Sequence, residues 1–165
     1  MLVAQHSLPR PRSAEPVHAA APFFCALAAV LALAGAAQAA ERGLMISHPW
    51  IRSILPSLPA AGYFTLSNET ATPRELVGAR SPACGSLTLH RSISRGGTER
   101  MEMVKSVTVP AHGAVSFAPG GYHLMCLSPS GAVRPGQAIA VTLSFADGNT
   151  VTTDFPVRGA AGTRQ

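Results

Sequence analysis

Four residues of this chain carry side chains suited to binding a soft metal ion. They are His90, Met101, His123 and Met125, spaced as His, ten residues, Met, twenty-one residues, His-x-Met. Thioether sulfur is a soft donor that favours Cu(I) over Zn²⁺, Mg²⁺ or Ca²⁺, and imidazole is a good copper ligand. The set contains no carboxylate and no group that would activate water. The pattern therefore indicates a site that carries copper as Cu(I), with Cu(II) left open, rather than an enzyme centre.

His123 and Met125 can bind the same metal ion if they lie on an extended strand. Residues two apart on a strand point to the same face, so these two share one face and Leu124 points to the other. If Leu124 faces the core, the pair faces outward, where metal can be accepted and released. Met101 and Met103 also share one face of a strand. Met103 is either a substitute ligand or a residue that fills an irregular gap in the core.

Short apolar runs separated by Gly, Pro, Ser and Asn indicate an all-β domain. Alternate residues from 139 to 145 are apolar and predicted to face inward, with the polar or small ones between them outward: Ile139, Val141, Leu143 and Phe145 against Ala140, Thr142 and Ser144. Asp147-Gly148-Asn149 then predicts a hairpin turn. Strands are predicted at 44–52, 61–68, 74–80, 86–93, 100–108, 114–118, 122–128, 137–145 and 149–156. Such spacing is typical of a sandwich or barrel.

The ligand spacing resembles that of the periplasmic copper chaperones called PCu(A)C, whose signature is the same His-x10-Met-x21-His-x-Met. Further segments also resemble the family, so that the resemblance runs from about Leu44 to Pro156: His48–Arg52, Ala60–Asn68, Glu75–Val77 through Ser81–Pro82, and Pro119–Met125. The family often has a methionine directly after the first histidine, where this chain has Arg91.

The resemblance implies a cupredoxin-like Greek-key β-sandwich that binds one copper ion through the four residues. It implies a periplasmic metallochaperone that delivers copper towards the CuA centre of a cytochrome oxidase. The receiving partner would be the oxidase CuA subunit or a thioredoxin-like copper assembly factor.

The same residues are open to three further interpretations. One Cys, two His and one Met form the ligand set of a blue-copper electron carrier, and Cys126 lies beside the site. Strand parity turns Cys126 away from His123, which argues against that set. The second interpretation is a copper-buffering protein without a specific client, and the third is a secreted sandwich with incidental Met and His. His48 and His112 have no Met at ligand spacing and are not expected to be ligands.

The N-terminal segment is predicted to direct export to the periplasm. Arg10 and Arg12 precede an apolar run at 23–36 that is too short to span a bilayer, and Ala37-Gln38-Ala39 is a cleavage site of the A-x-A type. An uncleaved anchor is the competing interpretation. Cys25 lies in the apolar run without the small-residue box of a lipoprotein. No second apolar span follows, so no stable membrane insertion is expected after cleavage.

These features predict three parts of the chain: a removed signal peptide at 1–39, a copper-binding β-sandwich at 40–158 and a flexible tail at 159–165. Cys84 and Cys126 remain after cleavage, and an oxidising compartment favours a disulfide between them over two free thiols.

Charge excludes several classes of function. The chain has 13 Lys and Arg against 8 Asp and Glu, a net charge of +5, and the positive residues are scattered. There is no basic stripe with interleaved aromatic residues, so no nucleic-acid partner is expected. The few acids leave little for acid–base catalysis. A scattered positive charge could steer the protein to an acidic partner.

Overall fold

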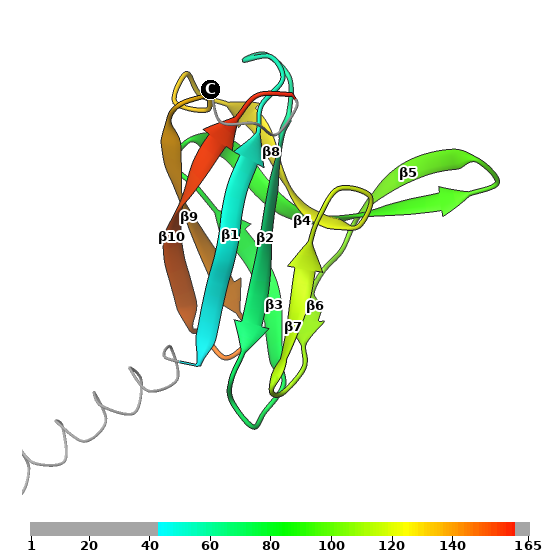
Figure 1. Cartoon of the computed structure of the whole chain (residues 1–165), viewed down its shortest axis with the longest axis vertical. Coiled ribbons are helices and arrows are strands. Elements are labelled where there is room, and N and C mark those ends of the chain that lie inside the picture. Colours follow the sequence, from blue (N-terminus) through cyan, green and yellow to red (C-terminus); the bar gives the residue numbers. More distant parts are fainter. Residues whose placement is uncertain (1–42, 161–165) are drawn as a thin grey trace, which may run out of the picture. The chain divides into compact units, whose positions relative to one another are not determined.

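The computed structural model describes residues 43–160, and within that range the chain forms strands and turns and no helix (Figure 1). The strands are β1 Leu44–Arg52, β2 Ala60–Asn68, β3 Arg74–Arg80, β4 Cys84–Arg95, β5 Thr98–Met103, β6 Val107–Val109, β7 Gly113–Phe117, β8 Tyr122–Pro129, β9 Ala138–Phe145 and β10 Thr150–Arg158. The predicted signal peptide and residues 161–165 of the predicted tail lie outside the described residues. No helix in the described part is long and apolar enough to cross a membrane.

Hydrogen bonding joins the strands in the order β5-β4-β8-β7-β2-β1-β10-β9-β3-β6, with an added β8–β2 pairing. Many neighbours in this order are far apart in the chain, as Greek-key connections require. The strands from β5 to β1 make one half and those from β10 to β6 the other. Buried residues of both halves meet in one core. The predicted all-β, cupredoxin-like Greek-key sandwich is confirmed.

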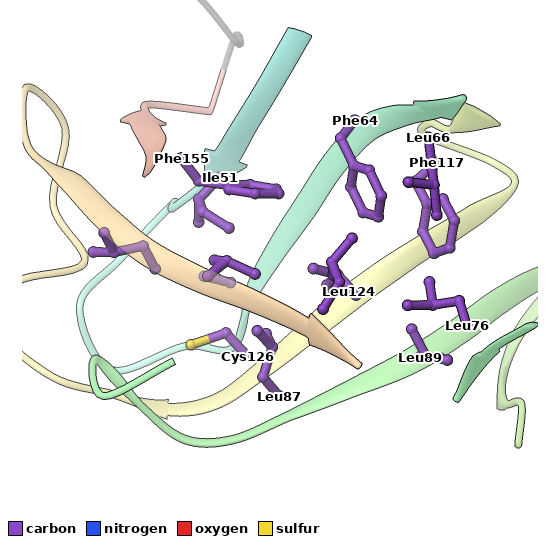
Figure 2. Packing of buried hydrophobic residues seen from close by; sticks show 14 of the residues in the cluster. Ile51, Phe64, Leu66, Leu76, Leu87, Leu89, Phe117, Leu124, Cys126 and Phe155 are labelled. Carbon is purple, nitrogen blue, oxygen red and sulfur yellow. The ribbon is translucent and has the colours of Figure 1, made fainter. Parts of the chain in front are cut away.

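Aromatic and branched side chains from both halves fill the core (Figure 2). Phe64 of β2 stacks on Phe117 of β7 with ring centroids 4.3 Å apart, and it meets Phe155 of β10 edge-on at 5.6 Å. Leu124 of β8 is fully buried in the same cluster. Each large apolar side chain buried in this way contributes about 1.5–3 kcal/mol. This core fixes the strands that carry the candidate ligands.

Strand β9 follows the predicted alternation except at one residue. Its four inward apolar residues are buried as predicted: Ile139, Val141, Leu143 and Phe145. Thr142, predicted to face outward, is buried, and its hydroxyl is hydrogen-bonded to that of Thr152 on β10 at 2.8 Å. The predicted turn is confirmed: Gly148 has φ 84°, and the carboxylate of Asp147 accepts a hydrogen bond from the Asn149 amide at 3.0 Å.

The strand predicted at 100–108 is wrong as a single element. The chain forms β5, which pairs with β4, and then β6, which pairs with β3 in the other half. Every residue of β5 is exposed, whereas Val107 and Val109 of β6 are buried. Between them, the Val104 amide donates to the Leu89 carbonyl at 2.9 Å. Residues 100–108 contain no Gly or Pro to mark the crossover between the halves, and the sequence pattern therefore predicts one strand where two form.

Candidate metal site

The two histidines of the predicted site lie directly opposite each other on adjacent antiparallel strands. His90 of β4 pairs with His123 of β8, and Thr88 pairs with Met125. Residues directly opposite in an antiparallel pair share one face of the sheet. The imidazole centroids are 5.8 Å apart, with the ring planes inclined by 39°. Two side chains 33 residues apart in the sequence thus become neighbours.

Three of the four predicted residues line one cleft, and the fourth lies beside it. Met101, His123 and Met125 line a cleft of about 510 Å³ whose other walls come from β1, β2, β4 and β5, the β1–β2 loop and the β7–β8 turn. The cleft-lining residues are Arg52, Ile54, Leu58, Pro59, Ala61, Tyr63, Ser92, Glu99, Met101, Pro119, Gly120, His123 and Met125. His90 is not among them and reaches this group through its ring contact with His123.

Exposure varies sharply across the four residues. Met101, on the edge strand β5, is 62% exposed, while Met125 and His90 are partly buried. His123 is only 4% exposed, although the sequence predicted that it would face outward with Met125. Its ring lies between those of His90 and Tyr63, at centroid distances of 5.8 and 6.5 Å, which shield it from solvent.

A backbone hydrogen bond fixes which nitrogen of His123 is free to bind a metal. Nδ1 lies 3.1 Å from the carbonyl oxygen of Gly121. A carbonyl only accepts hydrogen bonds, so Nδ1 carries the proton and donates it. Nε2 of the neutral ring then keeps its lone pair. Metal-binding histidines commonly have such a second hydrogen bond, which orients the ring and sets the tautomer.

His90 has a buried ring nitrogen that lacks a hydrogen-bond partner among the described residues. Its Nε2 lies 3.1 Å from the Thr88 hydroxyl, which can donate or accept, while Nδ1 is the unpartnered atom. Burial, and secondarily the proximity of His123, lowers the pKa of His90 from its ordinary value of 6.5. Both features favour a neutral imidazole with a lone pair for a cation, so this residue fits a metal site.

Two residues that help to build this region were not among the sequence-based candidates. Thr88 orients His90, and Arg52 brings a cation to the wall of the cleft, where its guanidinium lies 5.6 Å from the ring centroid of Tyr63. Burial raises the pKa of Tyr63, and Arg52 acts against that shift. Thr88 lies two residues before His90 on one strand, so period-two parity could have identified it.

Arg91, which stands where the family often has a methionine, does not face the site. Strand alternation turns it to the other face of β4, where its guanidinium lies 5.4 Å from the ring centroid of Tyr122. His48 and His112 are also not among the residues that line the cleft. His48 is exposed at an irregularity in the β1–β2 pairing, and His112 lies in the turn before β7.

No thiolate is available to a metal within residues 43–160. Cys84 and Cys126, the cysteines of that range, form the predicted disulfide, with Cα atoms 5.5 Å apart. Cys126 is fully buried and faces the core, as parity predicts. The described residues also contain no cluster of three or more His, Cys, Asp or Glu that could hold a metal. The donors that remain near the cleft are imidazole and thioether, which excludes a blue-copper ligand set built on Cys126.

Comparison with known proteins agrees with this fold. The family model "Putative lipoprotein LpqE-like" matches residues 44–157. The chain is 33% identical over 124 residues to "Putative lipoprotein Lxx21020" of Leifsonia xyli subsp. xyli (strain CTCB07), which covers 74% of each chain.

Two solved structures are similar over most of their length. One is the copper-bound PCuAC domain from PmoF2, with a TM-score of 0.60 and 27% identity, covering 71% of this chain and 93% of that domain. The other is the solution structure of CuI-DR1885 from Deinococcus radiodurans, with a TM-score of 0.57 and 30% identity, covering 74% and 85% respectively. A chain that shares this family model, this fold and these relatives belongs to the LpqE-like family, of the PCu(A)C type.

Proposed function

We propose that this protein is an exported copper metallochaperone that binds one Cu(I) through His90, Met101, His123 and Met125. The observation that carries the proposal is the β4–β8 register, in which the two imidazoles are direct neighbours and Met125 lies on the same face of the ladder. The similar structures described as copper-bound and CuI-bound support copper as the metal.

Each proposed ligand supplies a distinct property. His123 offers Nε2, because its Nδ1 proton is engaged by the Gly121 carbonyl. His90 offers its unpartnered Nδ1, if Nε2 donates to the Thr88 hydroxyl. Met101 and Met125 offer neutral thioethers, which favour the reduced ion. The thioethers make the site soft, and the absence of an anionic thiolate among the described residues favours easy exchange of the ion.

The surroundings of the cleft suit transfer of copper to another protein. Met101 is highly exposed, so an incoming ligand can displace it without unfolding the domain. Ile54 and Leu58 are exposed apolar residues on the cleft wall, and Arg52 is a cation beside them. Exposed apolar residues grouped near a site favour protein contact, and Arg52 favours an acidic surface on the partner.

We propose the CuA subunit of a cytochrome oxidase, or a thioredoxin-like copper assembly factor, as the receiving partner. The family resemblance supports this choice. The protein would act by ligand exchange rather than catalysis, because the proposed ligands are two imidazoles and two thioethers, a set suited to holding a soft ion. A copper buffer would bind the ion equally well but would not release it faster to a specific client.

The proposed location is the periplasm, after cleavage behind Ala39. The name of the Leifsonia relative as a lipoprotein supports export and raises a competing route, in which a lipid on Cys25 would hold the protein at a membrane. Intact-mass measurement of the protein from the membrane and periplasmic fractions separates the two. A mature chain that begins at Ala40 supports cleavage, and a diacylated chain that begins at Cys25 contradicts it.

The binding proposal is tested by titration of the mature protein with Cu(I) against a chromophoric chelator, followed by X-ray absorption of the loaded form. One Cu(I) per chain with two sulfur and two nitrogen neighbours is expected. The double variant His123→Ala, Met125→Ala should lose this binding, and His112→Ala serves as the matched control. Equal affinity in the wild type and the double variant would overturn the proposal.

Delivery is tested separately with an apo CuA domain as acceptor. Faster transfer from the loaded protein than from a copper–chelator complex of equal affinity supports a chaperone. Equal rates support the buffer.

A further inference from the structure

Three side chains with metal-binding chemistry lie in one row across three neighbouring strands. His123 of β8 is directly opposite His90 of β4, and His90 is directly opposite Met103 of β5. Directly opposite residues of antiparallel strands share a face, so all three lie on the face that carries the proposed site. The row ends at β5, which is the terminal strand of the hydrogen-bonded order.

Met103 is closer to His90 in the ladder than the signature methionine is. Met101 pairs with Ser92, which makes it a diagonal neighbour of His90. Cβ atoms of direct partners are about 4.5–5.5 Å apart, while diagonal neighbours are about 7–8 Å apart. On the backbone alone, His90 is therefore within reach of the Met103 thioether, with His123 on its other side.

Met103 does not pack in the core, the second role that its sequence position allowed. Its side chain is 69% exposed, and it lines a shallow surface hollow together with Thr88, the hydrogen-bond partner of His90. That hollow is distinct from the cleft lined by Met101 and Met125. The methionine therefore lies near the surroundings of His90 but outside the cleft.

Exposure rises steadily along the row. His123 is 4% exposed, His90 is partly buried, and Met103 is 69% exposed. His90 lies in the middle with a buried Nδ1 that has no partner among the described residues. A histidine with a donor on each side can stay bound while a metal exchanges one neighbour for the other.

We infer that Met103 is a fifth copper donor, which with His90 forms an outer position for the same Cu(I) ion. The inference rests on the proposed function and concerns how the ion leaves the site. In the exchange, a coordinate bond from the Met103 sulfur to copper forms and the bond from the Met101 sulfur breaks. Copper stays Cu(I), and both thioethers are neutral, so no electron or proton moves. Met103 then holds the ion at the exposed edge strand, where a partner can take it.

Methyl NMR of the wild-type protein tests the contact directly. With ¹³C-methyl methionine, the resonances of Met101, Met103 and Met125 should all move on addition of one equivalent of Cu(I), while exposed Met45 on β1 should not. A Met103 methyl that stays as unmoved as that of Met45 would overturn the inference.

Leucine variants test the same point by function. Met103→Leu should slow transfer to a chelator by several-fold, because the exposed outer position is lost. Affinity should fall by up to roughly tenfold, at the lower end of what an altered metal environment costs. Met101→Leu should retain two sulfur neighbours by X-ray absorption, because Met103 replaces it. The double variant should retain one. Met45→Leu is the matched control for an exposed methionine.

The outcomes separate this inference from the function on which it rests. If Met101→Leu already has one sulfur neighbour and matches the double variant in affinity, Met103 is not a donor, and the four-residue site stands. If the wild type binds no Cu(I), both proposals fall. Since Met103 is exposed, Leu at this position should leave the thermal unfolding midpoint unchanged, which checks that the variants are folded.

Discussion

The two faces of the β4–β8 ladder are made by the same strands but have different roles, one in the core and one in the proposed metal site. One face packs into the core through apolar residues, with Leu87, Leu89, Leu124 and Cys126 buried. The other carries the imidazoles of His90 and His123 and the thioether of Met125. Because alternate residues face opposite ways, each strand supplies one residue to stability and the next to metal chemistry. The two properties should therefore be separable by mutation, one residue at a time.

The largest effect is expected on the core face, from loss of the disulfide. The disulfide joins residues 42 apart. Closing a loop of that length lowers the entropy of the unfolded chain and so raises the free energy of unfolding by about 4 kcal/mol. The double variant Cys84→Ser, Cys126→Ser should lose about this much stability, measured by urea unfolding through the fluorescence of Trp50, the single tryptophan. The folded protein should still bind one Cu(I). Loss of copper binding by folded protein would show that a cysteine takes part in the site.

A cavity on the same face should have a slightly smaller effect. Leu124 is fully buried and lies between the two candidate ligands of β8 in the sequence. Leu124→Ala should lower the free energy of unfolding by about 3 kcal/mol. Copper affinity at temperatures where the variant is folded should change little, because the side chain faces away from the metal. An affinity loss as large as that of His123→Ala would mean that the two faces are coupled.

A substitution on the other face, which carries the proposed ligands and is called the metal face here, should affect copper binding more than stability. His123→Ala removes a proposed ligand and should weaken Cu(I) affinity by roughly 100-fold, the scale on which altered metal environments act. Its stability should fall less than that of Leu124→Ala, measured by the same urea unfolding. If His123→Ala loses as much stability as Leu124→Ala but keeps its copper affinity, His123 is a core-packing residue and not a ligand. Its low exposure would fit that role.

The alternation that separates the two faces was predictable from the sequence, but the pairing between strands was not. Leu124 inward and Met125 opposite in direction follow from local parity. The placement of His90 opposite both His123 and Met103 depends on register between strands, which is set by the whole sandwich. Residues 100–108 were predicted as one strand for the same reason. The crossover of the chain at Val104 from one half of the sandwich to the other depends on tertiary structure and leaves no local sequence signal.

The burial of His123 also lay beyond the sequence pattern. Parity predicts the face of the sheet but not what covers that face. Tyr63, which flanks His123, comes from β2, and a strand so distant in the chain gives no local signal. Spacing identified the four candidate ligands because the family signature is long and specific, whereas Thr88 and Arg52 emerged only once the strands were assembled.

The smallest expected effect is that of pH. It again differs between the faces, because the buried residues of the core face are leucines and the disulfide-bonded Cys126, whereas the metal face carries imidazoles. The pKa of His90 is lowered from 6.5 by burial and by His123. An unfolded chain would therefore take up this proton at a higher pH than the folded one. The stability contribution of neutral His90 is complete above about pH 6.5 and declines as pH falls below that value towards the folded-state pKa.

Copper binding should follow the same direction, because a bound imidazole must be deprotonated. Protons compete for His90 only below about pH 6.5, and each competing proton costs at most about tenfold in affinity per pH unit. We therefore expect Cu(I) affinity, measured by competition from about pH 7.5 to about 5, to fall at the acid end in the wild type and in the control His112→Ala. His90→Ala should bind more weakly at neutral pH and lose part of the acid slope. The thioethers do not titrate, so binding should persist at the lowest pH. If His90→Ala and the wild type have the same pH slope of copper affinity, protons and copper do not compete at this imidazole. His90 would then not be a copper ligand, and His123 would be the histidine ligand of the site.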